Sequence, residues 1–216
     1  MIVFSHGFGV DKNSRGLFSN IVAIFGKENC VQFDYNDIDS DNNTITVTPL
    51  NKQAEKLREM LASIDEPINL ICHSQGCLVA ALAMPVGLQS ILFLAPASTT
   101  TSSELKKRFN KHLKFDKKLT SHFVQRTDGT KTIINQEYWD SLDAVGDVDT
   151  KYVELASKTF LTVITAGEDD LVDTRFDALE NKAEIFTMPG ADHNFTGSSR
   201  EKLLDIFRQL KNQRLD

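Results

Sequence analysis

The chain has 216 residues, of which 41% are hydrophobic and 25% charged, and this composition is that of an ordinary soluble globular protein. Its formal net charge of −6 argues against a general nucleic-acid binder, and no apolar run reaches the length of a membrane span. The three cysteines lack the spacing of a metal site and fit reduced thiols, and the chain begins without the features of a signal peptide, so we expect a cytoplasmic protein.

Short apolar segments alternate with amphipathic ones along most of the chain. Buried strands are predicted at 2–5, 31–34, 68–73, 91–95, 160–165 and 183–188. Helices are predicted at 15–25, 49–61, 75–84 and 201–210, and a polar loop at 36–46. Because the strands are continuously apolar, they favour a parallel sheet covered by helices on both faces, with its sites beyond the carboxyl ends of the strands.

One stretch interrupts this alternation. Apolar residues at every fourth position from Leu105 indicate a helix, a hairpin is predicted to turn at Asp128-Gly129, and "NQEYWDSL" indicates a short helix. This stretch is too structured for a linker. We therefore expect a cap at 98–150, inserted into a core domain that is formed by 1–97 and 151–216.

The predicted cap is basic, whereas the rest of the chain is acidic. Positions 101–131 contain nine Lys or Arg and three Asp or Glu, so this segment carries about +6 and the remainder about −12. Such a cap would draw anionic substrates toward a site, or its charges would simply keep an exposed helix face soluble. Three aromatic residues would either line an acyl or aryl pocket or form the small core of the cap: Phe123, Tyr138 and Trp139.

Ser74 lies between an apolar strand and a helix of small residues, in "INLICHSQGCLVAALA". A strand, x-Ser-x-Gly and a helix are what a nucleophile elbow needs, because the tight bend exposes the hydroxyl and Gly76 leaves room where strand and helix nearly touch. The helix N-terminus also directs N–H groups at developing negative charge. Cys72 stands where this motif usually has its first glycine. The alternative is a plain turn.

A serine nucleophile needs a base and an orienting carboxylate. His193, in "MPGADHNF", follows the last strand and opens on the same edge of the sheet as Ser74, so it is the best-placed base. The other histidines are less suitably placed. His112 and His122 lie in the predicted cap, His6 lies in the first turn, and His73 adjoins the serine with its side chain expected to point away. The carboxylate is expected after the fifth strand, among Glu168, Asp169, Asp170 and Asp173.

The oxyanion of such a reaction needs two N–H donors. The backbone N–H of Gln75, directly after the nucleophile, is the first candidate. The second is expected from "HGFG", which follows the first strand, because its glycines let backbone N–H groups face a cavity. Taken alone, "HGFG" is equally an ordinary glycine turn.

Together these motifs resemble the α/β-hydrolase family, and they occur in its order of Ser, Asp and His: "HGFG", "CHSQG", "GEDDLV" and "GADHNF". The resemblance implies an α/β-hydrolase fold with a minimal, about six-stranded, mostly parallel sheet, helices on both faces and a small inserted cap. It selects Asp170, three residues after Gly167, as the acid, with Asp169 and Asp173 as alternates. It also assigns the second oxyanion N–H to Phe8.

Within that family the chain most resembles small carboxylesterases related to bacterial cinnamoyl and feruloyl esterases. This implies a serine-dependent hydrolase of small-molecule carboxylic esters with small to medium acyl or aryl groups. It would act through an acyl-enzyme on Ser74, with His193 as base and without a metal or cofactor. An acyl thioesterase is the first alternative and a non-catalytic binding protein on the same fold the second. The sequence gives no oligomeric state.

Overall fold

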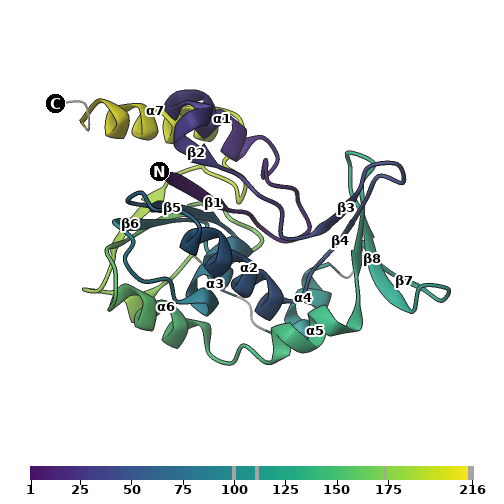
Figure 1. Cartoon of the computed structure of the whole chain (residues 1–216). Helices are drawn as coiled ribbons and strands as arrows, with labels where there is room; N and C mark the ends of the chain where they lie inside the picture. The colour runs from purple at the N-terminus through teal and green to yellow at the C-terminus, as the bar shows by residue number, and fades with distance from the viewer. Residues whose placement is uncertain (99–100, 110–111, 173, 214–216) are drawn as a thin grey trace.

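A six-stranded sheet forms the centre of the molecule (Figure 1). The computed structural model describes residues 1–98, 101–109, 112–172 and 174–213. The strands of this sheet are β1 (Ile2–Ser5), β2 (Cys30–Val31), β5 (Asn69–His73), β6 (Ser90–Leu94), β10 (Leu161–Ala166) and β11 (Glu184–Met188). They lie in the order β11-β10-β6-β5-β1-β2, and every neighbouring pair runs parallel. The predicted parallel sheet is confirmed.

Helices cover both faces of this sheet (Figure 1). The helices are α1 (Leu17–Phe25) and α7 (Ser198–Gln213) on one face, and α2 (Leu50–Ala62), α3 (Gln75–Ala83) and α6 (Val148–Ala156) on the other. Two short 3-10 helices complete the core, η1 (Lys27–Asn29) and η2 (Asp177–Leu179). Because its side chains are small, α3 lies close to β1 and packs between α2 and α6. No helix of the described ranges has the length and apolar character needed to span a bilayer.

The order of the strands creates a crevice at one edge of the sheet. From β1 the chain passes outward to β2, whereas from β5 it passes in the opposite direction to β6. The loops that follow the adjacent strands β1 and β5 therefore diverge, and ligands of open parallel sheets bind at such points. Here the two loops are "HGFG" and the turn at Ser74.

A second, five-stranded sheet lies to the right of the six-stranded sheet in Figure 1. Its strands are β3 (Asp37–Asp39), β4 (Thr44–Thr46), β7 (Leu113–Asp116), β8 (Ser121–Gln125) and β9 (Lys131–Ile134), in the order β3-β4-β9-β8-β7. The predicted hairpin at Asp128-Gly129 joins β8 to β9, with Gly129 at φ 87°. Two helices flank this sheet, α4 (Ser102–Arg108) and α5 (Gln136–Asp143).

Three details of this region differ from the predictions. The segment 36–46, predicted as a polar loop, contains the hairpin β3–β4, because β4 pairs in parallel with the distant strand β9. The helix that begins near Leu105 ends at Arg108, and Leu113 begins strand β7. Helix α6 begins at Val148 and packs on α3 in the core. The second sheet thus combines three strands from the predicted cap with two from an earlier segment.

Candidate active site

Ser74 lies in a strained turn between β5 and α3. Its φ of 55° and ψ of −123° are unusual for a residue with a side chain. The turn depends on Gly76, because a Cβ there would lie 2.0 Å from the carbonyl oxygen of Ser5 in β1. Cys72, in place of the usual glycine, is fully buried within β5. The backbone therefore places the Ser74 hydroxyl at the carboxyl edge of the sheet.

The structure brings Ser74, His193 and one carboxylate into a single hydrogen-bonded row. His193 Nε2 lies 2.8 Å from Ser74 Oγ, and His193 Nδ1 lies 2.7 Å from Asp169 Oδ2. His193 is supplied by the loop after β11 and Asp169 by the loop after β10. The second oxygen of Asp169 accepts the N–H groups of Leu171 and Val172 at 2.8 and 3.0 Å.

The carboxylate beside His193 belongs to Asp169 rather than to Asp170, which corrects the expectation from the sequence. A tight turn in which the Asp169 N–H bonds the carbonyl of Ala166 directs this side chain inward, where it is buried, while Asp170 is exposed. The third expected acid, Asp173, lies outside the described residues. Burial alone would raise the pKa of Asp169. Its hydrogen bond to His193 and the nearby N–H groups lower the pKa by more than burial raises it, so the net pKa lies below the usual range.

His73 holds the loop of His193 through a hydrogen bond to its backbone. Its Nε2 donates to the backbone carbonyl of His193 at 2.9 Å, and its Nδ1 accepts the hydroxyl of Ser14 at 3.1 Å. Burial lowers the pKa of His73 to about 3, and the nearby His193 ring adds to this effect. His73 is therefore neutral at ordinary pH, and its position agrees with the expectation that it points away from Ser74.

The "HGFG" loop lies directly against the nucleophile. A Cβ on Gly7 would come within 3.2 Å of the Ser74 Cβ. Within the described part of the chain, the backbone N–H groups of Phe8 and Gln75 donate to no protein acceptor, so both remain open to a ligand. The arrangement around Gly9 requires glycine, because its φ is 59° and a Cβ would lie 2.6 Å from Arg126.

The second sheet anchors this loop. Arg126, at the end of β8, donates from one terminal nitrogen toward the carbonyls of Phe8 and Gly9, at 3.3 and 3.4 Å. Its Nε donates to the Thr132 hydroxyl at 3.0 Å, and this hydroxyl donates to the Gly9 carbonyl at 3.3 Å. The position of the Phe8 N–H thus depends on two side chains that are remote in sequence.

The side chain of Gln75 ties the second sheet's helices to the core. Its amide nitrogen donates to Gln53 of α2 at 3.1 Å, and its oxygen accepts the Tyr138 hydroxyl of α5 at 2.5 Å. Of the three aromatic residues considered from the sequence, Tyr138 and Trp139 are fully buried. Only Tyr138 lines the cavity at Ser74 that is described next. The ring of Tyr138 also packs on Phe8, with ring centres 5.3 Å apart.

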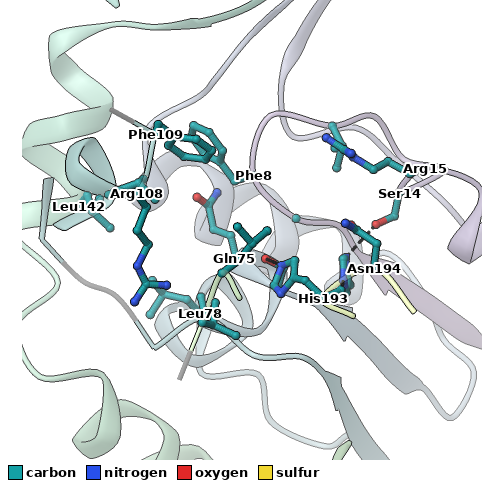
Figure 2. A pocket seen from close by; sticks show the side chains of 18 of the residues that line it. Phe8, Ser14, Arg15, Gln75, Leu78, Arg108, Phe109, Leu142, His193 and Asn194 are labelled. Carbon is teal, nitrogen blue, oxygen red and sulfur yellow. Dashed lines mark hydrogen bonds between the residues drawn. The ribbon is translucent and has the colours of Figure 1, made fainter. Parts of the chain in front are cut away.

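A cavity of about 150 Å³ has Ser74 in its lining. Figure 2 shows Phe8, Gln75 and His193 among the side chains around it. Its walls are mainly apolar, and they come from the first loop, α3, α4 and α5: Phe8, Val10, Leu78, Leu105, Phe109 and Leu142. The rings of Phe8 and Phe109 stack with centres 5.6 Å apart. Among the residues that the structure describes, no group of three or more His, Cys, Asp or Glu side chains is arranged to bind a metal ion.

A family model described as serine hydrolase matches residues 36–143, half of the chain. The chain belongs to the serine hydrolase family. No curated protein sequence matches it.

Solved structures that resemble this serine hydrolase include Est1E from Butyrivibrio proteoclasticus, at 15% identity and a TM-score of 0.60 over 99% of this chain and 87% of that one. A monoacylglycerol lipase from Paleococcus ferrophilus is 12% identical, with a TM-score of 0.64 over 96% and 93% of the two chains. A lipase-esterase related protein from Clostridium acetobutylicum is 12% identical, with a TM-score of 0.64 over 98% and 93%. At these identities the likeness shows the α/β-hydrolase fold.

Sequence reasoning missed three residues that support the site of this serine hydrolase. From the sequence, Ser14 is expected only as the cap of the helix predicted at 15–25, whereas the observed helix begins at Leu17. Arg126 counted only as one of nine basic side chains in its segment. Thr132 lies in a predicted hairpin strand and carries no signal that it faces "HGFG". Their roles depend on contacts between segments far apart in the chain, which residue spacing does not reveal.

Proposed function

We propose that the protein is a serine-dependent hydrolase of carboxylic esters, with Ser74, His193 and Asp169 as its catalytic triad. The observation that carries this proposal is the continuous row of hydrogen bonds from Asp169 through His193 to Ser74, at 2.7 and 2.8 Å, below a mainly apolar cavity. Acyl transfer to serine needs this order of carboxylate, imidazole and hydroxyl.

Each member of the row has a defined task. Ser74 Oγ attacks the acyl carbon while His193 Nε2 takes the hydroxyl proton, and His193 then gives this proton to the leaving alcohol oxygen. Asp169 accepts the Nδ1–H of His193, which leaves Nε2 free to accept a proton. Because the pKa of Asp169 is lowered, this carboxylate stays ionised and stabilises the imidazolium.

The backbone N–H groups of Phe8 and Gln75 would stabilise the oxyanion that forms on the acyl carbonyl. Both belong to loops at the crevice, and Gln75 begins helix α3, whose N-terminal dipole favours negative charge. Water then attacks the acyl-enzyme, with His193 again as base, and releases the carboxylic acid and free Ser74. This scheme requires no metal or cofactor.

The cavity supports substrates with small to medium acyl or aryl groups. Its volume is about 150 Å³ and it is walled by the stacked rings of Phe8 and Phe109. In one of the similar structures, ferulic acid is bound to Est1E from Butyrivibrio proteoclasticus. We extend the comparison to this chain as part of the proposal: an esterase related to feruloyl esterases.

The test is hydrolysis of para-nitrophenyl esters of increasing acyl length by the purified protein, beside a matched acyl thioester. We expect saturable release of nitrophenol, with a higher kcat/KM for a short or medium ester than for the thioester. A higher value for the thioester would replace this proposal with a thioesterase. No turnover of any ester would contradict the proposal and favour a binding protein.

A further inference from the structure

Among the residues that the structure describes, the lining of the cavity at Ser74 includes three arginines and no acidic side chain. Arg15, Arg108 and Arg126 line it, although the whole chain has a net charge of −6. In the described part of the chain, no carboxylate lies within 4.0 Å of any of these three guanidinium groups. The carboxylate of the proposed triad, Asp169, is buried behind His193 and does not line the cavity.

Two of these cations lie close together. Arg126 is partly buried, and burial together with the positive charge of Arg15 lowers its pKa to about 10. Asp128 is the carboxylate that acts on Arg126, but its oxygen accepts the N–H of Thr130 at 2.9 Å and it forms no ion pair with either arginine. Placing like charges together disfavours both, and a bound anion would relieve this repulsion.

The loop that carries Arg15 is held in an unusual conformation. Ser14, Arg15 and Gly16 have consecutive positive φ values of 46°, 55° and 81°. Strain of this kind in residues with side chains persists where the surroundings require it, and it is concentrated at functional sites. A neighbouring cavity of about 630 Å³, between this loop and the second sheet, also has Arg15 and Arg126 in its walls. Because Asp11, Asp39 and Asp128 line it as well, an anionic group would be held at the two arginines and not beyond them.

The third cation lies on the other side of the catalytic residues. Figure 2 shows Arg108 beside Leu142 and Leu78, whereas Arg15 lies beyond His193 with Ser14 and Asn194. Within the described residues, Arg108 forms no hydrogen bond or ion pair. Lys107 and Arg108 of α4 are both exposed, but only Arg108 lines the cavity, so helix α4 directs one of these two charges toward the site.

We propose that the substrate is an ester that also carries a negative charge, a carboxylate or phosphate, separated by a short apolar part from the scissile bond. This inference rests on the proposed function and specifies its substrate class. A positive field alone would stabilise the oxyanion of any ester, but guanidinium groups also form directed, paired hydrogen bonds with a carboxylate or phosphate. The apolar walls between the arginines fit the uncharged part of such a molecule.

The charge can occupy either part of the ester, and the two cases involve different arginines. His193 protonates the leaving alcohol, so an anionic alcohol would extend on the side of Arg15 and Arg126. An anionic acyl chain would lie along the apolar wall and end at Arg108. The chemistry of recognition is the same in both cases, and the experiment separates them.

The experiment compares two matched pairs of esters. In the first pair the acyl chain ends in a carboxylate or in a primary amide: the para-nitrophenyl monoester of adipic acid and that of its monoamide. In the second pair the alcohol carries the same change: para-acetoxybenzoate and para-acetoxybenzamide. We expect the anionic member of at least one pair to have about tenfold higher kcat/KM at low salt, and this advantage should shrink as salt is added.

Variants identify the arginine involved. Arg108→Gln should remove the preference for the anionic acyl chain, and Arg15→Gln the preference for the anionic alcohol. The matched control is Lys107→Gln, which removes one positive charge from the same helix outside the cavity and should leave both ratios unchanged. A loss of the preference in Lys107→Gln as large as in Arg108→Gln would show a general charge effect and contradict this inference.

Failure of this inference is distinguishable from failure of the proposed function. If all four esters are hydrolysed and the neutral member of each pair is equal or better at low salt, the anionic substrate class is wrong and the esterase stands. If none of them, nor any simple ester, is hydrolysed, the proposed function fails and this inference fails with it.

Discussion

The two sheets of the molecule contribute different parts of the candidate site. The six-stranded sheet provides Ser74, Asp169 and His193, each from a loop that directly follows a strand. The five-stranded sheet and its helices provide walls and supports, including Arg126 and Tyr138. The proposed chemistry thus belongs to the doubly covered sheet, and the proposed selectivity to a sheet that has helices only at its flanks. Changes in the first should affect all substrates, and changes in the second should affect some more than others.

The largest effect is expected from the nucleophile. Ser74→Ala should lower kcat by about 10⁶-fold for every ester, because no acyl-enzyme can form. The measurement is ester hydrolysis by purified protein, with the thermal midpoint recorded to show that the variant is folded. Ser103→Ala, at an exposed position of α4, is the matched control and should retain full activity. A loss below tenfold in Ser74→Ala would contradict the assignment.

The next largest effect distinguishes two adjacent carboxylates of the first sheet. Asp169→Asn should lower kcat by about 10⁴-fold, because an amide in this place favours the wrong tautomer of His193. Asp170→Asn changes an exposed neighbour and should leave kcat within about twofold, as surface substitutions usually do. Steady-state kinetics on one neutral ester suffices. A large loss in Asp170→Asn with little loss in Asp169→Asn would restore the acid that the sequence favoured.

A smaller effect tests whether the second sheet positions the first loop. Arg126→Ala should lower kcat for a neutral ester by about tenfold to a hundredfold, less than complete loss of an oxyanion donor, because the carbonyls of Phe8 and Gly9 lose their support. KM should change little, and Arg126→Lys should recover part of the rate. Rates are divided by the amount of Ser74 that a fluorophosphonate labels, so that unfolded protein does not lower the apparent kcat. An unchanged kcat in Arg126→Ala would show that the contact has no positioning role.

The last prediction concerns stability and not catalytic rate: the folded state should lose stability at low pH because of His73, which lies against the loop of His193. His73 in the unfolded chain takes up a proton below pH 6.5 or so, whereas its folded pKa is about 3. The unfolded state therefore binds more protons between these values, and stability falls as pH falls, by up to about 1.4 kcal/mol per pH unit. The free energy of unfolding is measured with urea at several pH values from 7 to 4. Plotted against pH, it should have a shallower slope in His73→Asn than in the parent.

The exposed His112→Asn variant is the control for this pH effect and should keep the slope of the parent. Equal slopes in the parent and in His73→Asn would contradict the burial of a neutral His73. The two hydrogen bonds of His73 are lost in the variant at every pH, so the slope is compared rather than the stability at a single pH.

The same division between the sheets decides what the sequence could predict. The segment around Ser74 was predictable because its signals are local: an apolar strand, then Gly76 two residues after the serine, then a helix of small residues. Strand β4 was not, because its partner β9 lies far along the chain and only Ile45 among its three residues is buried. Arg126 could not be distinguished from the other eight basic residues of 101–131 by sequence alone, because only the fold brings it to "HGFG".

The acid shows where counting along a loop reaches its limit. Four acidic residues follow Gly167 within six positions, and any of them fits a carboxylate after the fifth strand: Glu168, Asp169, Asp170 and Asp173. The choice depends on one turn, in which the Asp169 N–H bonds Ala166 and the Asp169 side chain accepts the N–H groups of Leu171 and Val172. The sequence places the loop correctly, but only the backbone hydrogen bonds select the residue.

The central claim is that Ser74 is an activated nucleophile, and covalent labelling tests it most directly. The purified protein is treated with a fluorophosphonate, which reacts with activated serines, and the adduct is mapped by mass spectrometry while ester hydrolysis is followed in parallel. We predict one adduct per chain, on Ser74, with activity lost in proportion to labelling and labelling strongly slowed in Asp169→Asn. An adduct on another residue, or active protein with Ser74 unmodified, would contradict the account.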